Sequence, residues 1–464
     1  MAGTFAVLGD THFVRESAHF NALKLGWPGG VTEWDDLVRN GWMTRCVTPR
    51  ILEEIRSQKV DFLLHTGDII PGHCDTAEGQ IEEMEQAIRM LDTAGAPFFF
   101  SCGSHDGVLG GKEDAALKQT LYPYLSSQLG QNCQRSYYSF SRLGCKFISL
   151  DYTTWDQTQR EFLEEQLRRS APEELVVVFG HPPVVPLARP FFTGEAYAVE
   201  VAELFARYPV HAYFCGHTHN HAASIHRFGG HETAQLMSTP LGYPDAPPVP
   251  LSDVRPILPD AGTFRYGWGF LEDTMPGWWL VTVEEDRLTA CWYALGRGLE
   301  GIVSIPKSGP AEFLQVPPCK STCGVLPDMA AVVRARIRLA GSGTHGAALG
   351  QVLFNGQPLQ TGKPLVYFDS RQFIDIPKEL FPCIETQNKL TVELQNAGES
   401  VGAAVIELLL DNGRIVRSGV SPFYTTNAAY AERLPHAFAL RGVGKAVIPI
   451  SFQLDAGQAE PFSL

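Results

Sequence analysis

Five short segments most constrain how this chain can fold, because each joins an apolar run to glycine and then to aspartate or histidine. The apolar runs are residues 5–8, 62–64, 97–100, 175–179 and 212–215. The polar segments after them are Gly9-Asp10-Thr11-His12, Gly67-Asp68, Gly103-Ser104-His105-Asp106, Gly180-His181 and Gly216-His217-Thr218-His219. Short apolar runs are typical of buried strands in an α/β sheet. Because the carboxyl ends of such strands line one crevice, we expect these side chains to meet there.

The residue types in these segments indicate a metal site. Carboxylates can bridge two cations, and the alternate residues His217 and His219 would project to one side of an extended chain. Nitrogen and oxygen donors without thiolate favour Mn, Fe or Zn. Taken singly, Asp10 or Asp68 could cap a helix, and each histidine could be a turn or core residue. Five such segments together favour the metal interpretation.

The order and spacing of the segments resemble those of the calcineurin-like metallophosphoesterase family. That family's signature reads Asp-x-His, Gly-Asp, Gly-Asn-His-Asp/Glu, Gly-His and Gly-His-x-His, and the resemblance covers about the first 296 residues. It implies an α/β domain, the four-layer α-β-β-α sandwich. It also implies two divalent ions, with metal ligands at Asp10, His12, Asp68, Ser104, His181, His217 and His219.

The resemblance further implies a role for each residue. The first ion would be held by Asp10, His12 and His219. The second would be held by His181 and His217, and Asp68 would bridge both. His105 would protonate the leaving oxygen and Asp106 would steady it. The implied reaction is attack of a metal-bridging hydroxide on a phosphoester.

Three positions narrow the reaction class within the resemblance. Protein phosphatases of the superfamily carry arginine where this chain has Cys102, and purple acid phosphatases carry tyrosine where it has Pro71. Asp106, in place of glutamate, matches a pattern common among bacterial phosphodiesterases. A phosphodiester is therefore the expected substrate, with a phosphomonoester as second choice.

Ser104 departs from the signature, which has asparagine at that position. A serine hydroxyl is shorter than a carboxamide and a weaker ligand for a cation. The second site would then bind its metal weakly, take a water in place of the amide, or stay empty. The alternative function is a catalytically attenuated metal-binding protein whose C-terminal part binds a glycan or a protein partner.

The chain divides into two expected domains. Residues 1–300 would form the catalytic domain, with long loop insertions at 13–48 and 242–276 whose aromatic residues either wall the substrate or pack together. Residues 311–464 contain short alternating runs separated by turn residues, as at Asn355-Gly356. This pattern predicts an all-β sandwich, jelly-roll-like and loosely similar to accessory modules of carbohydrate-active enzymes.

Composition bears on partners and location. The 464 residues are 44% hydrophobic and 19% charged, which is ordinary for a globular protein. A net charge of −14 argues against a nucleic-acid partner. No apolar stretch is long enough for a membrane span, and no leader is visible. We therefore expect a cytoplasmic protein with a small-molecule phosphoester as its partner, an exported form with a trimmed leader being the alternative. Nothing in the sequence indicates the oligomeric state.

Overall fold

The computed structural model describes two thirds or more of the chain and most of the segments singled out above. The described residues are 3–15, 40–72, 74, 76–107, 115–171, 174–185, 195–219, 221–238, 264–265, 269–272, 276–315, 321–323, 326–342, 351–359, 371–394, 400–413, 415–418, 421, 423–425, 438–439 and 444–452. Among them, no helix is both long enough and apolar enough to cross a membrane.

The first sheet has seven strands in the order β15-β14-β13-β12-β1-β2-β3. These are β1 (Gly3–Leu8), β2 (Phe62–His65), β3 (Phe98–Phe100), β12 (Gly277–Val283), β13 (Arg287–Ala294), β14 (Gly298–Pro306) and β15 (Glu312–Gln315). β1, β2 and β3 are parallel, and the other pairs are antiparallel. The first three ligand segments therefore leave the same edge of this sheet.

The second sheet follows the order β10-β8-β9-β7-β6-β5-β4, with β11 also paired to β8. Its strands are β4 (Tyr138–Arg142), β5 (Cys145–Ser149), β6 (Leu175–Phe179), β7 (Ala212–Cys215), β8 (His221–Phe228), β9 (His231–Met237), β10 (Phe264–Arg265) and β11 (Gly269–Glu272). β5, β6, β7 and β9 run parallel. The last two ligand segments follow β6 and β7, so they too leave one edge.

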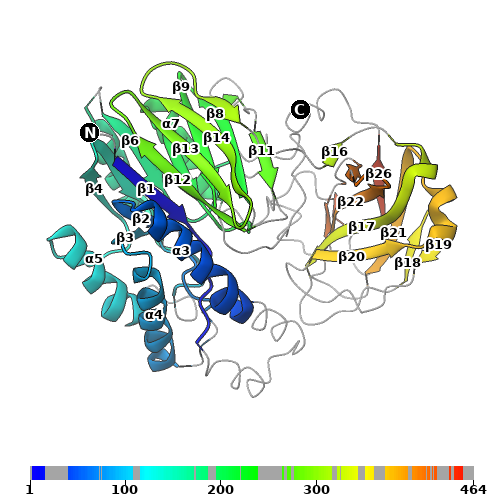
Figure 1. Cartoon of the computed structure of the whole chain (residues 1–464), viewed down its shortest axis with the longest axis horizontal. Coiled ribbons are helices and arrows are strands. Elements are labelled where there is room, and N and C mark those ends of the chain that lie inside the picture. The colour runs from blue at the N-terminus through cyan, green and yellow to red at the C-terminus, as the bar shows by residue number, and fades with distance from the viewer. Residues whose placement is uncertain are drawn as a thin grey trace.

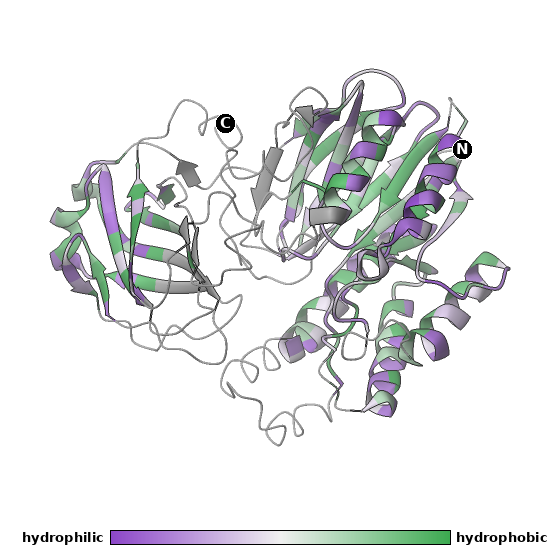
Figure 2. Ribbon diagram, turned by 180° about the vertical axis from the view of Figure 1, so that it is seen from behind, coloured by the Kyte–Doolittle hydropathy of each residue, from purple (hydrophilic) through white to green (hydrophobic). Residues whose placement is uncertain are grey.

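Aromatic side chains join the two sheets face to face. The ring of Phe5 stacks on Phe62 in the first sheet, with centroids 5.1 Å apart, and meets Phe147 and Phe214 of the second sheet edge-on at 5.4 and 5.9 Å. Edge-to-face and offset pairs at these spacings are favourable beyond the area that they bury. Figure 2 shows the resulting apolar strands between more polar helices. This contact sets how the edges of the two sheets face each other.

Helices cover the outer faces of both sheets (Figure 1). Apolar residues of α3 (Thr48–Gln58), α4 (Ala77–Asp92) and α5 (Tyr122–Leu129) belong to the core of the first sheet. Those of α6 (Gln157–Arg168) and α7 (Glu195–Arg207) pack on the outer residues of β5, β6 and β7. The predicted four-layer α-β-β-α sandwich is confirmed.

Some predicted loops contain regular structure. Residues 40–42 are helical and continue through the π-helical turn Met43–Val47 into α3, so the helix begins before the expected start at Thr48. A wide turn fits here because Pro49 has no N–H to donate to the preceding turn. In the predicted loop 242–276, β10 and β11 pair with β8. Residues 16–39, 242–263, 266–268 and 273–275, which include Trp27, Trp34, Tyr266 and Trp268, lie outside the described residues.

The hairpin of β8 and β9 was not predicted from the sequence. Five of the residues in β8 and β9 that are buried are polar or titratable: His221, Ser224, His226, Thr233 and Gln235. Their side chains interrupt the apolar alternation by which a half-buried strand is recognised. Tertiary pairing with β7 and β11 therefore specifies this hairpin more than its own pattern does.

The C-terminal part is built from two further sheets. One has the order β16-β23-β22-β17-β20, with β24 on β22 and β25 on β24, and the other has the order β19-β18-β21-β26. Their strands are β16 (Ser321–Cys323), β17 (Val332–Ser342), β18 (Val352–Phe354), β19 (Gln357–Leu359), β20 (Arg371–Ile376), β21 (Gln387–Leu394), β22 (Ser400–Leu410), β23 (Ile415–Arg417), β24 (Phe423–Thr425), β25 (Phe438–Ala439) and β26 (Gly444–Ser451).

One hydrophobic cluster lies between these two sheets. Ile337 and Ile406 come from the first and Leu390 and Ile448 from the second, and all four are fully buried. Two mainly antiparallel sheets that share one core form a β-sandwich, so that prediction is confirmed. The division into residues 1–300 and 311–464 stays a prediction, and β14 and β15 extend the N-terminal sheet to Gln315.

Removing the Phe5 ring tests the contact between the first two sheets. We expect Phe5→Ala to lower the free energy of unfolding of the N-terminal part by about 3–5 kcal/mol, because a cavity replaces a fully buried aromatic side chain. Urea unfolding followed by fluorescence measures this. Leu314→Ala, at a side chain that is 58% exposed, is the control and should change it by less than about 0.5 kcal/mol.

Candidate metal centre

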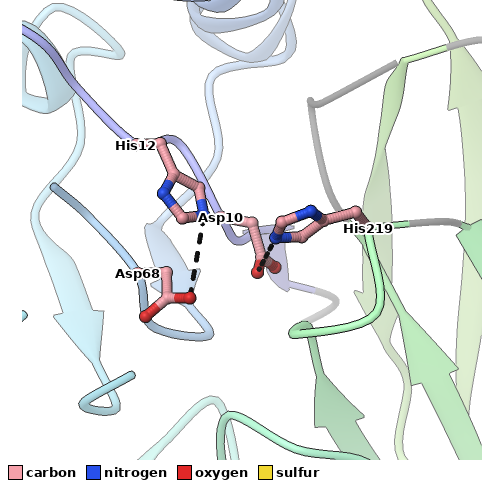
Figure 3. Close-up of side chains that lie close together, drawn as sticks. All are labelled: Asp10, His12, Asp68 and His219. Atoms are coloured by element: carbon pink, nitrogen blue, oxygen red, sulfur yellow. Dashed lines mark ion pairs between the residues drawn. The ribbon is translucent and has the colours of Figure 1, made fainter. Parts of the chain in front are cut away.

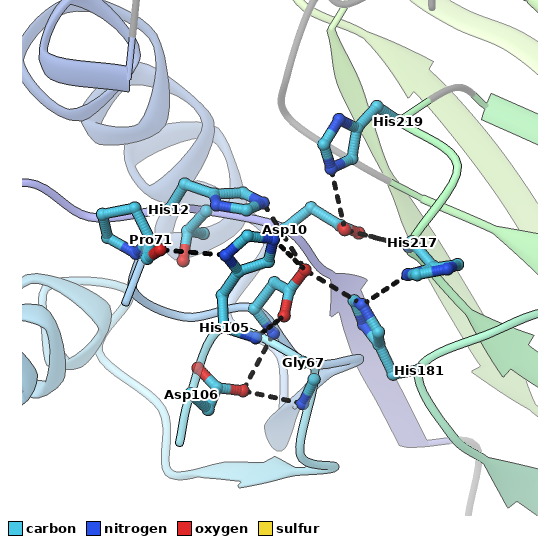
Figure 4. A network of polar contacts seen from close by, with 12 residues as sticks. Asp10, His12, Gly67, Pro71, His105, Asp106, His181, His217 and His219 are labelled. Atoms are coloured by element: carbon cyan, nitrogen blue, oxygen red, sulfur yellow. Dashed lines mark hydrogen bonds and ion pairs between the residues drawn. The ribbon is translucent and has the colours of Figure 1, made fainter. Parts of the chain in front are cut away.

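The polar segments converge where the carboxyl ends of the two sheets meet (Figure 4). Asp10 follows β1, Asp68 follows β2 and His105 follows β3, while His181 follows β6. Asp10, Asp68 and His181 are at most 1% exposed. Buried carboxylates are expensive unless a cation or hydrogen-bond donors compensate their charge. The site therefore needs positive charge close to both aspartates.

The first potential ligand group contains Asp10, His12, Asp68 and His219, whose donor atoms lie within 4.8 Å of one another. Figure 3 shows that the His12 ring points at Asp68 and the His219 ring at Asp10. His12 Nε2 lies 3.6 Å from Asp68 Oδ2, and His219 Nε2 lies 3.5 Å from Asp10 Oδ1. Both distances exceed hydrogen-bond length. Each pair is therefore far enough apart for both atoms to bind one ion.

The second potential ligand group contains Asp68, His181 and His217. His181 Nε2 lies 3.0 Å from Asp68 Oδ2 and 3.1 Å from His217 Nδ1. A divalent ion that binds nitrogen and oxygen at about 2.0–2.2 Å holds neighbouring donors about 3.0–3.5 Å apart. These separations therefore fit ligands of one ion. Asp68 belongs to both groups, as a bridging carboxylate would.

The backbone at the ligand segments is held in an unfavourable conformation. Positive φ angles occur at Asp10 (51°), His12 (41°), Asp68 (55°), His217 (74°) and His219 (54°). A side chain in this left-handed region costs free energy, and such residues persist only where the surroundings enforce them. Their concentration here indicates that the fold places these side chains for binding, at a cost in stability.

Glycine is required beside two of the carboxylates. A Cβ added at Gly103 would collide with Asp68 Oδ1, and one added at Gly216 would collide with Asp10 Oδ2. The loops after β3 and β7 thus approach the aspartates more closely than any residue with a side chain allows. This packing explains two of the five glycines in the sequence pattern, Gly103 and Gly216.

Hydrogen bonds orient the imidazoles. His181 Nδ1 lies 2.8 Å from the carbonyl oxygen of Thr66, and a carbonyl only accepts, so Nδ1 donates and Nε2 is the atom that faces Asp68 and could bind a cation. This arrangement is typical of metal-binding histidines. His12 Nε2 is buried and makes no hydrogen bond to the described residues. The donor set and this unsatisfied nitrogen fit a bound divalent cation.

Burial and the charge of Asp68 shift the pKa values of the buried groups in the cluster. Burial lowers the pKa of His12 well below its ordinary value, which keeps its imidazole neutral, as a ligand must be. Burial alone would also lower the pKa of His181, but the adjacent Asp68 carboxylate raises it to about 9. Burial opposes the charge on Asp68, yet His181 and His105 hold the pKa of that carboxyl well below its usual range.

Asp106 holds two ligand loops together. Its fully buried carboxylate accepts hydrogen bonds from the backbone N–H groups of Asp68 (2.9 Å), Ile69 (2.7 Å) and Gly103 (2.8 Å). Burial, followed by the charge of Asp68, raises the pKa of Asp106 to about 7, although the backbone donors favour its charged form. In these contacts Asp106 steadies the loops after β2 and β3.

The carbonyl oxygen of Pro71 orients the ring of His105. Its Nδ1 lies 2.9 Å from the carbonyl oxygen of Pro71, and its backbone N–H donates to Asp68 Oδ1 at 2.8 Å. Its Nε2 lies 4.0 Å from Asp68 Oδ2, and its side chain is 43% exposed. His105 belongs to neither ligand group of the described residues. It stands beside the cluster as a proton donor would.

Ser104 is exposed and belongs to neither ligand group, whereas Tyr152, which sequence analysis missed, packs against the second group. The centroid of the Tyr152 ring lies 5.7 Å from that of His181 and 5.9 Å from that of His217. Tyr152 follows β5, one more parallel strand that ends at this edge. The signal was the apolar run 145–149 followed by Leu150-Asp151-Tyr152, which lacks the glycine common to the other segments.

A comparison with models of protein families gives a match to the N-terminal part of the chain. The family model described as calcineurin-like phosphoesterase matches residues 3–221. That range contains all nine residues singled out from the sequence. No curated protein matches the chain.

Three solved structures are similar to about two thirds of the chain. A purple acid phosphatase from yellow lupin seeds is 14% identical, with 68% of this chain and 57% of that one covered, at a TM-score of 0.43. A dimetal phosphatase from Danio rerio is 12% identical, with 66% and 99% covered, at 0.43. GAP50, the inner membrane complex anchor of Plasmodium, is 14% identical, with 68% and 90% covered, at 0.40. At these TM-scores they add nothing to the family model.

Metal removal tests the cluster as a cation site. We expect chelation to lower the melting temperature and Mn²⁺ or Zn²⁺ to restore it, because a ligand at 100 times its Kd stabilises the folded state by about 2.7 kcal/mol. Asp68→Asn should abolish the metal-dependent shift. Asp286→Asn, at a carboxylate 68% exposed on the surface, should keep it. An equal shift in both variants would contradict the site.

Asp106→Ala tests the loop-holding carboxylate. We expect a 10–100-fold loss of metal affinity, the usual consequence of removing a group that orients ligands. Asp156→Ala is the matched control, since Asp156 caps α6 by accepting from Gln159 N–H at 2.9 Å, away from the ligands. It should cost about 1 kcal/mol of stability without changing metal affinity. Calorimetric titration with Mn²⁺ separates the two effects.

Proposed function

We propose that this chain, whose residues 3–221 form a calcineurin-like phosphoesterase domain, is a metal-dependent hydrolase that cleaves a phosphodiester. Hydrolases of this superfamily act on phosphoric esters. The observation that carries the proposal is the position of Asp68, which belongs to both groups of potential ligands and lies 4.0 Å from His105. A shared carboxylate between two sets of imidazoles suits a dinuclear centre.

The cofactors would be two divalent ions drawn from Mn, Fe and Zn. Asp10, His12, Asp68 and His219 would hold one, and Asp68, His181 and His217 the other. When bound, two such ions polarise the phosphoryl oxygens and lower the pKa of the attacking water. The second group offers fewer protein ligands than the first, which supports weaker binding there.

His105 would supply the proton for the leaving oxygen. Because Pro71 O accepts from Nδ1, that nitrogen keeps its hydrogen, and Nε2 is the atom that gains and loses a proton. The side chain of His105 is 43% exposed whereas that of Asp68 is 1% exposed, so a substrate would reach the imidazole from solvent. Asp68 also accepts from the His105 backbone N–H, which fixes the distance between acid and ligand. Proton donation to the departing alkoxide is the usual contribution of such an imidazole.

A phosphodiester is the preferred substrate class. Asp106 in the position after His105 supports it, as do Cys102 and Pro71, which replace the arginine and tyrosine of two monoester-cleaving or protein-directed branches. Cys102 is 2% exposed, so it offers no charge to a phosphomonoester dianion. The small-molecule substrate itself stays open.

A pair of chromogenic substrates tests the substrate class. With Mn²⁺ added, we expect faster turnover of bis(p-nitrophenyl) phosphate than of p-nitrophenyl phosphate. Faster turnover of the monoester would overturn the diester assignment and keep the hydrolase. Turnover of neither, alongside cyclic nucleotides and glycerophosphodiesters, by metal-loaded protein would favour the attenuated metal-binding alternative.

His105→Gln tests the proton donor. We expect kcat to fall by about 10²–10⁴ on an alkyl phosphodiester, whose leaving alkoxide needs protonation. The loss should be much smaller on a nitrophenyl ester, whose leaving group departs as an anion. Metal content should be unchanged. His231→Gln is the control, because His231 starts β9 at the opposite end of the strand from the ligands. Equal losses on both substrates would exclude the acid role.

A further inference from the structure

Thr11 and His65 form a hydrogen-bonded pair next to the first ligand group. Thr11 stands between the ligands Asp10 and His12, and His65 is the last residue of β2. Both members of the pair are fully buried. Thr11 Oγ1 lies 3.1 Å from His65 Nε2, and its hydroxyl donates to the carbonyl oxygen of Ile69 at 3.0 Å. The pair thus connects the loop after β1 with the loop after β2.

The direction of each hydrogen bond in this pair is fixed. Thr11 has a single hydroxyl hydrogen and donates it to Ile69, because a carbonyl oxygen only accepts. His65 Nε2 must therefore carry the hydrogen that Thr11 Oγ1 accepts. His65 Nδ1 then accepts from the backbone N–H of Gly67 at 3.3 Å, as it can in a neutral imidazole. Burial lowers the pKa of His65 to about 3, which agrees with the neutral form.

The backbone on both sides of Thr11 is strained, with φ of 51° at Asp10 and 41° at His12. Such a conformation persists only where the surroundings enforce it. Three backbone N–H groups of the loop after β1 donate to carbonyl oxygens of the loop after β2: Asp10 to Gly67 (2.8 Å), His12 to Asp68 (3.0 Å) and Phe13 to Ile69 (2.7 Å). The Thr11 hydroxyl adds a side-chain donor to this set and so helps to hold the strained segment in place.

The loop that carries Asp68 is held on two sides at Ile69. The Ile69 N–H donates to Asp106 Oδ1 at 2.7 Å, and the Ile69 carbonyl oxygen accepts from the Thr11 hydroxyl. Asp68, the residue before, carries the carboxylate that both ligand groups share. Asp106 therefore fixes this loop relative to the loop after β3, whereas Thr11 fixes it relative to the loop after β1.

We propose that Thr11 and His65 are positioning residues that set the distance between Asp68 and the two ligands that follow β1, and thereby the cation affinity of the first ligand group. His65 acts by orienting the Thr11 hydroxyl toward Ile69, and Thr11 acts through the loop that carries Asp68. Neither of the two is a ligand. The inference rests on the proposed function, because it takes the first ligand group as a cation site.

Thr11→Val and Thr11→Ser test the hydroxyl group. Valine has nearly the shape of threonine, so the substitution removes the hydrogen bonds with little change of volume. We expect Thr11→Val to weaken Mn²⁺ binding at the first ligand group by about 10–100-fold, the usual loss when a group that orients ligands is removed. Thr11→Ser keeps the hydroxyl and should keep most of the affinity. Calorimetric titration with Mn²⁺ measures both.

Co²⁺ in place of Mn²⁺ reports the arrangement of the ligands, because its visible absorption depends on their number and geometry. With one equivalent of Co²⁺ bound, the spectrum of Thr11→Val should differ from that of the unmodified protein. The spectrum of Thr11→Ser should match it. A hydroxyl that only stabilised the fold would leave the spectrum of Thr11→Val unchanged.

Thr233→Val is the matched control. Thr233 is 1% exposed, and its hydroxyl donates to the carbonyl oxygen of Val210 at 2.8 Å, which is a bond of the same kind. Val210 precedes β7, whereas the ligands His217 and His219 follow that strand. Thr233→Val should lower the melting temperature about as much as Thr11→Val and leave the Mn²⁺ affinity and the Co²⁺ spectrum unchanged.

Two results would overturn the inference. One is an equal Mn²⁺ affinity and an equal Co²⁺ spectrum in Thr11→Val and the unmodified protein. The other is an equal loss of affinity in Thr233→Val, because the loss would then follow stability alone. If Thr11→Val does not fold, the double variant with His65→Leu takes its place, since it leaves no imidazole N–H unpaired in the core. The same loss is expected there, and unchanged affinity would overturn the inference.

The same measurements separate this inference from the proposed function. If the unmodified protein binds neither Mn²⁺ nor Co²⁺, the metal centre and the hydrolase assignment both fail. If it binds Mn²⁺ and Thr11→Val binds it equally well, only the role of Thr11 and His65 fails. If the metal-loaded protein cleaves no phosphoester, the proposed function fails, and the affinities of the variants still decide the positioning role.

Discussion

The burial of Asp68 is the constraint on which this part of the molecule depends. Its carboxylate is 1% exposed and is approached by the rings of His12, His105 and His181. An isolated buried carboxylate would take up a proton, but the surrounding imidazoles hold its pKa low. A divalent cation satisfies the same carboxylate and leaves the imidazoles neutral. The buried carboxylate of Asp68 therefore stays ionised only when positive charge lies beside it.

Assembling this cluster lowers the stability of the fold. Five of the potential ligands have positive φ, and each such residue costs about 1–3 kcal/mol in the general case. Asp106 offsets part of it by accepting backbone hydrogen bonds from the loops after β2 and β3. The aromatic contact between the two sheets, centred on Phe5, keeps the two sets of loops facing each other. The hydrogen bonds of Asp106 and the aromatic contact between the sheets thus offset the strain of the ligand backbone.

Much of the N-terminal architecture could be predicted because apolar runs and glycines recur in a distinctive order. The five expected strands appear as β1, β2, β3, β6 and β7 within a residue or two of their predicted bounds. The β8–β9 hairpin escaped because buried histidine, serine and glutamine interrupt its pattern. The early start of the helix before Pro49 escaped because a π-helical turn has no local signature in the residues themselves.

By itself the sequence determined which residue types stand at which strand ends, since strand periodicity and glycine are local properties. It could not show that Asp106 bonds backbone groups of two loops, or that Pro71 orients His105, because these contacts join segments 34–38 residues apart. Only the tertiary structure could show that Tyr152 lies at the site. Its ring packs against His181 because β5 runs parallel to β6 and ends at the same edge.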